Sequence, residues 1–247
     1  AKTIENKLRS DANFVWLYRH LTPRKHYAIN RLGIPGLEFQ RESRRLYPVG
    51  PLASHVLGYT DLDSKGLAGI ERYFDKKLRT SQQSIALSID VRVQHMLEHE
   101  LGIGKKTFRA LGAAGLVMNV DTGEVLAMAS LPSYSPNQPR NIDEPLLFNR
   151  ATLGVYEMGS TFKIFTTAMA LELGAVTLSD GYDCTNPIKV SRFSIRDYHA
   201  KKRWLSVKEI FVHSSNIGSA KMALAVGVQA HRNFLEKLGL LKPIKIE

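Results

Sequence analysis

The sequence has one cysteine, no long apolar run and no excess of acidic residues, and each absence narrows the class of protein. The single Cys184 excludes an internal disulfide and a cysteine-based metal site, so we expect it to be a small apolar core residue. No run of about 18 uncharged apolar residues occurs, so nothing in this chain is expected to span a bilayer. The segment Ala1–Glu5 does not have the pattern of a signal peptide.

Basic residues outnumber acidic ones by 34 to 23, which gives a formal charge of +11. A charge of this size favours anionic partners such as nucleic acid, acidic lipid headgroups or an anionic substrate. The chain has no zinc-finger spacing, no glycine-rich phosphate loop and no aromatic–basic pattern of the RNA-binding kind. We therefore expect no nucleic-acid partner, no metal and no cofactor.

With 44% apolar and 23% charged residues, the composition is that of a globular protein, and its patterning changes near residue 80. Residues 1–80 are rich in charge and interrupted by turns. After them, alternation predicts a strand over 84–90 and helical spacing predicts a helix over 91–101. The apolar runs 114–120 and 125–130 flank Asp121–Glu124 and predict a β-hairpin, whose sheet we expect helices to cover on both faces. The basic stretch from 180 to 204 is expected to be irregular.

The segment Arg41–Pro48 is the densest charge cluster of the first eighty residues. A solvated surface strand and a partner-binding surface are equally compatible with this pattern. No catalytic group is evident in this part of the chain.

Ser160 and Lys163 form the chain's only Ser-x-x-Lys, at the start of an apolar stretch that predicts a buried helix from about Ser160 to Leu173, with Gly174 at its end. A spacing of three residues places both side chains on one face. The positive helix end and apolar surroundings disfavour a charged lysine and lower its pKa. A lysine that loses its proton easily can activate a serine for acyl transfer. Alternatively, Ser160 is an ordinary N-cap and Lys163 a solvated surface residue.

The polar triplet Ser214–Asn216 separates two short apolar segments, 205–213 and 217–226, that we expect to be helices. The triplet could be a helix–helix turn whose side chains satisfy backbone groups. It could also be a loop that presents a hydroxyl and an amide to a cleft.

Together, these motifs resemble the class B penicillin-binding proteins, membrane-anchored transpeptidases that cross-link bacterial peptidoglycan. Gly159–Lys163 is similar to the nucleophile motif, and Ser214–Asn216 follows at 214 − 160 = 54 positions, close to the usual interval. Glu42–Arg45 most resembles the division-specific, FtsI-like branch. The other matching segments are the hairpin turn Asp121–Glu124, Pro132–Tyr134, Pro136-Asn137, Tyr47-Pro48, Gly58–Thr60 and Gly66–Glu71.

The resemblance implies an α+β protein with two domains. An elongated pedestal (dimerisation-type) domain is expected over 1–80, and the N-terminal portion of a transpeptidase domain, an antiparallel sheet flanked by helices, over 81–247. Ser160 would be the nucleophile, Lys163 would accept its proton, Ser214 would relay a proton to the leaving D-alanine, and Asn216 would bind the substrate amide. The implied partners are D-Ala-D-Ala stem peptides, β-lactams, and cell-division or glycosyltransferase membrane proteins.

The same resemblance implies a location at the bacterial inner membrane, with the bulk of the chain on the periplasmic side and an anchor that is not in this chain. The family's third motif, Lys-Thr/Ser-Gly, is absent, the stretch between Phe74 and Ser84 is short, and Met158 stands where proline is common. We therefore expect a fragment, or only the ordered parts of a longer protein. Two alternatives remain: a serine β-lactamase or β-lactam sensor, and a non-catalytic scaffold for cell-wall or division proteins.

Overall fold

The computed structural model describes residues 2–9, 11–81, 83–139, 142–244 and 246. Within the chain, contacts divide these residues into two units, Ala1–Gly154 and Val155–Glu247. Both combine helices with short antiparallel sheets, which confirms the predicted α+β class. The units are defined by contacts alone and do not test the predicted domain boundary at residue 80, which stays a prediction.

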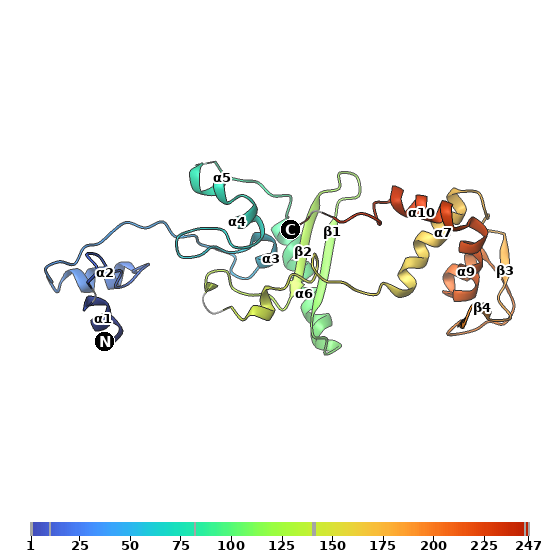
Figure 1. Cartoon of the computed structure of the whole chain (residues 1–247), viewed down its shortest axis with the longest axis horizontal. Coiled ribbons are helices and arrows are strands. Elements are labelled where there is room, and N and C mark those ends of the chain that lie inside the picture. Colours follow the sequence, from blue (N-terminus) through green and yellow to red (C-terminus); the bar gives the residue numbers. More distant parts are fainter. Residues whose placement is uncertain (1, 10, 82, 140–141, 245, 247) are drawn as a thin grey trace. The chain divides into compact units, whose positions relative to one another are not determined.

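The first unit is built around a β-hairpin and one long helix (Figure 1). Strands β1 (Ala113–Met118) and β2 (Val125–Leu131) pair antiparallel, and α6 (Val91–Thr107) packs against both. Helix α6 begins where the Asp90 side chain accepts hydrogen bonds from two backbone N–H groups of the first turn. Buried Gln94 ties α6 to β2 through the backbone N–H and C=O of Met128. The predicted hairpin is confirmed, and so is the predicted helix, which is longer than expected.

The remaining helices of this unit are short. They are α1 (Lys2–Leu8), α2 (Pro23–Asn30), α3 (Ser54–Leu57), α4 (Gly69–Tyr73), α5 (Asp75–Thr80) and the 3-10 helix η2 (Glu144–Leu147). Helices α1 to α5 precede α6 in the chain, and the 3-10 helix η2 follows the hairpin. Thr22 caps α2 and Pro23 occupies its first position, where a missing N–H costs nothing.

Two predictions for this unit are wrong. The segment 84–90 is not a strand of the sheet, and the chain bends at Ser88. The backbone N–H of Asp90 donates to the Leu126 backbone oxygen, but at Ser88 it is the side-chain hydroxyl that donates to the Val125 backbone oxygen. A serine hydroxyl thus makes the hydrogen bond to the neighbouring strand that a backbone N–H would make in a β-ladder. The hairpin is also not covered on both faces, because exposure alternates along β1 and leaves Leu116 and Met118 nearly half exposed.

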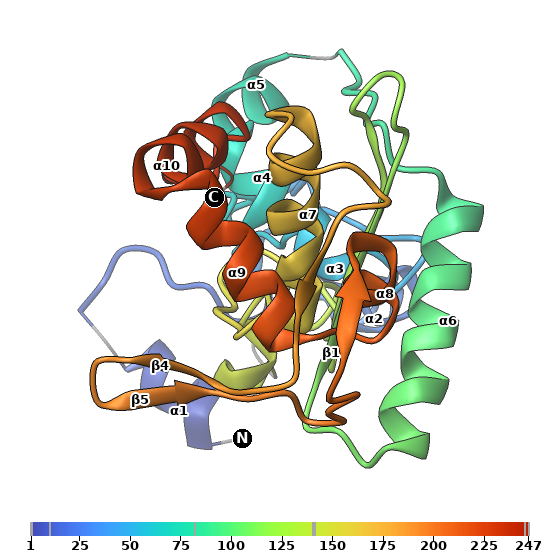
Figure 2. The same ribbon diagram turned by 90° about the vertical axis from the view of Figure 1, so that its right-hand side faces the viewer.

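In the second unit, helices α7 (Lys163–Glu172), α8 (Val207–Val212) and α9 (Asn216–Val226) contribute residues to a small apolar core, and α10 (Val228–Lys237) packs against α7 and α9 (Figure 2). The 3-10 turn η3 (Gly159–Phe162) precedes α7. The core consists of Ala170, Val176, Cys184, Leu205, Val207, Ile210, Ile217 and Met222. Cys184 is fully buried there, which confirms its predicted role as a core residue.

The stretch from 180 to 204, expected to be irregular, contains short strands. Strand β3 (Gly181–Asp183) pairs with β6 (Trp204–Ser206), and β4 (Ile188–Val190) pairs with β5 (Phe193–Ile195). The β4–β5 hairpin projects from this unit (Figure 2), and its strand β5 contacts α9. Each strand has only three residues, too few to show a period in the sequence. Among the described residues, no helix is long and apolar enough to cross a bilayer.

Candidate active site

The start of α7 brings Ser160 and Lys163 together. Ser160 lies in η3 and Lys163 begins α7, so the helix starts three residues later than expected. The Lys163 Nζ lies 3.2 Å from the Ser160 Oγ, as the three-residue spacing predicted. Neither η3 nor α7 has a side-chain cap, so Ser160 is not the N-cap that the alternative interpretation required.

The turn between α8 and α9 brings Ser214 and Asn216 to the same amine. Ser214 has a positive φ of 54°, an uncommon conformation for a residue with a side chain. Its backbone oxygen lies 2.7 Å and its Oγ 2.9 Å from the Lys163 Nζ. The Asn216 Oδ1 lies 2.6 Å from the same nitrogen. Three predicted site residues, Ser160, Ser214 and Asn216, therefore contact the fourth, Lys163. The triplet also joins α8 to α9 and satisfies backbone groups, as expected of a helix–helix turn, and its presentation of a hydroxyl and an amide to a cleft stays a prediction.

The types of group around Lys163 determine how its amine is oriented. The Ser214 carbonyl oxygen and the Asn216 Oδ1 can only accept, so they take two N–H groups. The hydroxyls of Ser160 and Ser214 can donate or accept. In the ammonium form, the third N–H points to a hydroxyl. In the neutral form, the lone pair occupies that position and can accept a hydroxyl proton.

The charge state of Lys163 is set by two opposing effects. Burial of the half-buried side chain lowers the pKa of Lys163 below its ordinary value, as the apolar context predicted. The carboxylate of Asp197 acts in the opposite direction and raises this pKa. Burial is the larger effect, so the neutral amine forms at a lower pH than in a solvated lysine.

Sequence reasoning missed Arg196 and Asp197, which follow β5 and contact the triplet. The Asn216 Nδ2 donates to the Arg196 backbone oxygen at 2.7 Å, and Ser215 Oγ donates to the Asp197 carboxylate at 2.9 Å. One signal was present in the sequence: Asp197 is the only acidic residue between 188 and 204, a stretch with six lysines and arginines (Lys189, Arg192, Arg196, Lys201, Lys202 and Arg203).

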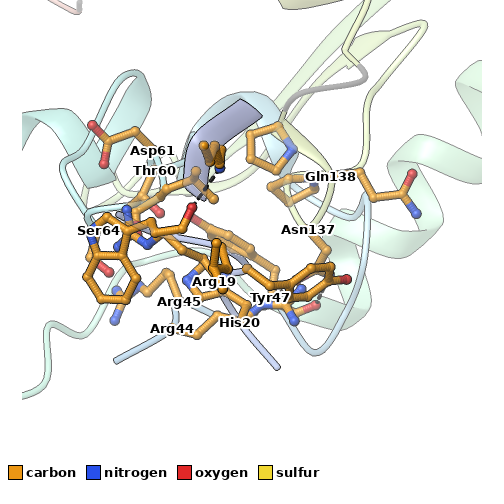
Figure 3. A pocket seen from close by; sticks show the side chains of 17 residues that line it. Arg19, His20, Arg44, Arg45, Tyr47, Thr60, Asp61, Ser64, Asn137 and Gln138 are labelled. Atoms are coloured by element: carbon orange, nitrogen blue, oxygen red, sulfur yellow. Dashed lines mark hydrogen bonds between the residues drawn. The ribbon is translucent and has the colours of Figure 1, made fainter. Parts of the chain in front are cut away.

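The charge cluster Arg41–Pro48 lies in the first unit, beside a cavity of about 620 Å³ (Figure 3). Arg45 pairs with buried Glu71 at 2.6 Å, and Glu42 pairs with Arg19 at the same distance. These pairs connect segments far apart in sequence, so Glu42 and Arg45 have internal structural partners. Partner binding by this cluster stays a prediction.

The chain belongs to the family described as the penicillin-binding protein transpeptidase domain. That family's model matches residues 113–247, and the model of the penicillin-binding protein dimerisation domain matches residues 1–100. The resemblance drawn from the motifs is thereby confirmed.

Individual relatives agree with the family. The chain is 46% identical over 231 residues to a "probable peptidoglycan D,D-transpeptidase FtsI" of Caulobacter vibrioides, covering 92% of this chain and 39% of that protein. It is 33% identical over 254 residues to the peptidoglycan D,D-transpeptidase FtsI of Escherichia coli K12, covering 93% and 43%. The chain thus spans about two fifths of the length of these curated relatives.

A solved structure also resembles the chain. It is the crystal structure of a "putative peptidoglycan glycosyltransferase" from Atopobium parvulum, with a TM-score of 0.70 and 27% identity. The similarity covers 79% of this chain and 49% of that one. The α+β fold predicted from the resemblance is therefore shared with this solved structure.

Proposed function

We propose that the natural protein containing this chain is a serine-type peptidoglycan D,D-transpeptidase, that β-lactams acylate the same serine, and that it acts in septal wall synthesis. The observation that supports this best is the Lys163 amine, which contacts the hydroxyls of both Ser160 and Ser214 while acceptor-only groups hold its other positions. The named D,D-transpeptidase relatives support the same reaction.

In the proposed reaction, the Ser160 Oγ attacks the carbonyl carbon of the penultimate D-alanine while its proton passes to neutral Lys163. The backbone N–H of Ser160, at the first turn of η3, would donate to the developing oxyanion. The C–N bond to the last D-alanine then breaks, and the leaving amine takes the proton through the Ser214 hydroxyl. An amine of a second stem peptide attacks the Ser160 ester, which forms the cross-link and frees the serine.

Asn216 would contact the substrate amide. Its Oδ1 faces Lys163 and its Nδ2 donates to Arg196. A side-chain amide has two acceptor lone pairs and two donor hydrogens, so one of each remains for a substrate. The surroundings proposed for this reaction are the periplasmic face of the inner membrane, with division and glycosyltransferase membrane proteins as partners. The charge of +11 suits an anionic precursor and anionic lipid nearby.

We expect the full natural protein to join a stem-peptide donor ending in D-Ala-D-Ala to an amine acceptor and to release one D-alanine per bond, as measured by mass spectrometry of the products. Ser160→Ala should abolish the product because the nucleophile is gone. Ser179→Ala, which removes a hydroxyl from an exposed turn of the same unit, should retain it. Rapid hydrolysis of a β-lactam without cross-linking would indicate a β-lactamase instead. Partner binding without acylation would indicate a scaffold.

A further inference from the structure

The segment Arg196-Asp197 holds the turn that carries Ser214 and Asn216. Asp197 accepts hydrogen bonds from the Ser215 hydroxyl, at 2.9 and 3.1 Å to its two oxygens, and from the backbone N–H of Ile217 at 2.9 Å. These two donors lie on either side of Asn216 in the sequence. One carboxylate therefore fixes the backbone before and after this site residue.

Ser215 links this carboxylate to the start of α9. Its side chain is the N-cap, accepting the N–H of Gly218 at 2.9 Å while it donates to Asp197. Ser215 is only 2% exposed and also contacts the buried Cys184. A hydroxyl buried this deeply needs a partner, because an unpaired buried polar group is costly. The Ser215–Asp197 bond is therefore part of what fixes the turn.

Arg196 fixes the direction of the Asn216 amide. Its backbone oxygen can only accept, so the group at 2.7 Å must be the Asn216 NH₂. The opposite end of the amide, Oδ1, is then directed at the Lys163 amine, 2.6 Å away. The neighbouring Ser214 carbonyl oxygen takes a second N–H of that amine. Two of the acceptors that bind the Lys163 amine thus belong to a turn that Arg196 and Asp197 hold in place.

We infer that Asp197 is a positioning residue for the proposed reaction: through Ser215 and Ile217, it holds the turn whose Ser214 and Asn216 oxygens orient Lys163 toward Ser160. This inference rests on the proposed function for its meaning in catalysis. The contacts of Asp197 are to the turn, and its effect on the reacting groups passes through Lys163.

Asp197 also acts on Lys163 by its charge. Its carboxylate raises the pKa of Lys163, against the larger lowering by burial. Among the charged groups on the elements that pack against α7, Lys208 of α8 and Arg232 of α10 are exposed, and Glu236 of α10 pairs with Lys242. The others bond to groups away from Lys163. These pairs are Glu209 with Arg203, Lys221 with the Asp183 backbone oxygen, and Glu172 with Lys237. Removal of the Asp197 charge should therefore lower the pKa of Lys163 further.

Two variants separate position from charge. Asp197→Asn keeps the shape and an acceptor but removes the charge, and Asp197→Ala removes both. In the full natural protein, we expect Asp197→Ala to lower the rate constant of penicillin acylation by about 10- to 100-fold at the pH plateau, because the amine is misplaced. Asp197→Asn should lose less rate and shift the rising limb of the pH profile to lower pH, since less of the amine is protonated there. Asp180→Asn, a turn-capping carboxylate of the same unit, is the matched control and should change neither quantity.

The pKa of Lys163 should also be measured directly, from the ¹³Cε signal of labelled lysine, assigned with Lys163→Arg. A lower pKa in folded Asp197→Asn than in the wild type supports the inference, and this readout needs no activity. A wild-type plateau rate in folded Asp197→Ala overturns the positioning role, and an unchanged pKa in folded Asp197→Asn refutes the charge effect of Asp197 on Lys163. If the wild type itself is not acylated at Ser160, the proposed function fails, and the Lys163 titration alone then decides whether Asp197 controls this amine.

Discussion

Lys163→Arg should reduce the rate of Ser160 acylation by about 100- to 10,000-fold, the range typical of a lost general base. Arginine keeps the positive charge and can donate to the Ser214 and Asn216 oxygens that now surround the amine. It cannot lose a proton in a protein, so it cannot accept the one on Ser160. The variant therefore separates the basicity of Lys163 from its charge. Stopped-flow or quenched acylation by a penicillin measures the rate constant.

Lys221→Arg provides the control for this substitution. Lys221 lies on α9 of the same unit and donates to the Asp183 backbone oxygen at 2.6 Å, a contact that arginine can reproduce. We expect its acylation rate to stay near that of the wild type. Acylation of Lys163→Arg at the wild-type rate would show that another group removes the Ser160 proton.

Met222→Ala should destabilise the protein by about 2–5 kcal/mol, the range for a buried methionine cut to alanine. Met222 is fully buried on α9 in the core cluster, together with Ala170 of α7. These two helices pack against each other and carry Asn216 and Lys163. The side chains around the new cavity would relax only in part, which would let the distance between the Lys163 amine and the turn at Ser214 vary. We therefore also expect acylation to slow. Urea unfolding followed by circular dichroism gives the free energy.

Leu224→Ala, on the same helix, is the matched comparison. Leu224 is 67% exposed, so the truncation leaves no cavity. Its effect should stay within about 0.5 kcal/mol. Equal losses for both variants would contradict core packing as the source of the Met222 contribution, because alanine is the better helix former at both positions.

The sequence was sufficient for those parts of the site that depend on local spacing. A separation of three residues brought Ser160 to Lys163, and the apolar runs around Asp121–Glu124 predicted the hairpin. In both cases the interacting residues are close in the chain. The apolar context also predicted the direction in which the Lys163 pKa moves.

What could not be predicted depends on pairing between distant segments. Strand β3 pairs with β6 some twenty residues later, and with three residues each neither has a recognisable pattern. Asp197 reaches Ser215 across eighteen positions, so no local spacing connects them. At 84–90 alternation was present, but Ser88 uses its hydroxyl where a strand would use its backbone. Side-chain hydrogen bonds of this kind compete with the backbone hydrogen bonds of a β-sheet, and the hydrophobic period of the sequence does not reveal them.

The central claim, that Ser160 is an acylated nucleophile, is tested most directly by the intact mass of the full natural protein before and after incubation with a penicillin. Opening the lactam breaks its C–N bond but releases no fragment, so the predicted result is one adduct with the whole mass of the drug. Peptide mapping should place it on Ser160, and Ser160→Ala should remove it without unfolding the protein. An adduct of unchanged stoichiometry on folded Ser160→Ala, or no adduct on the folded wild type, would contradict the account.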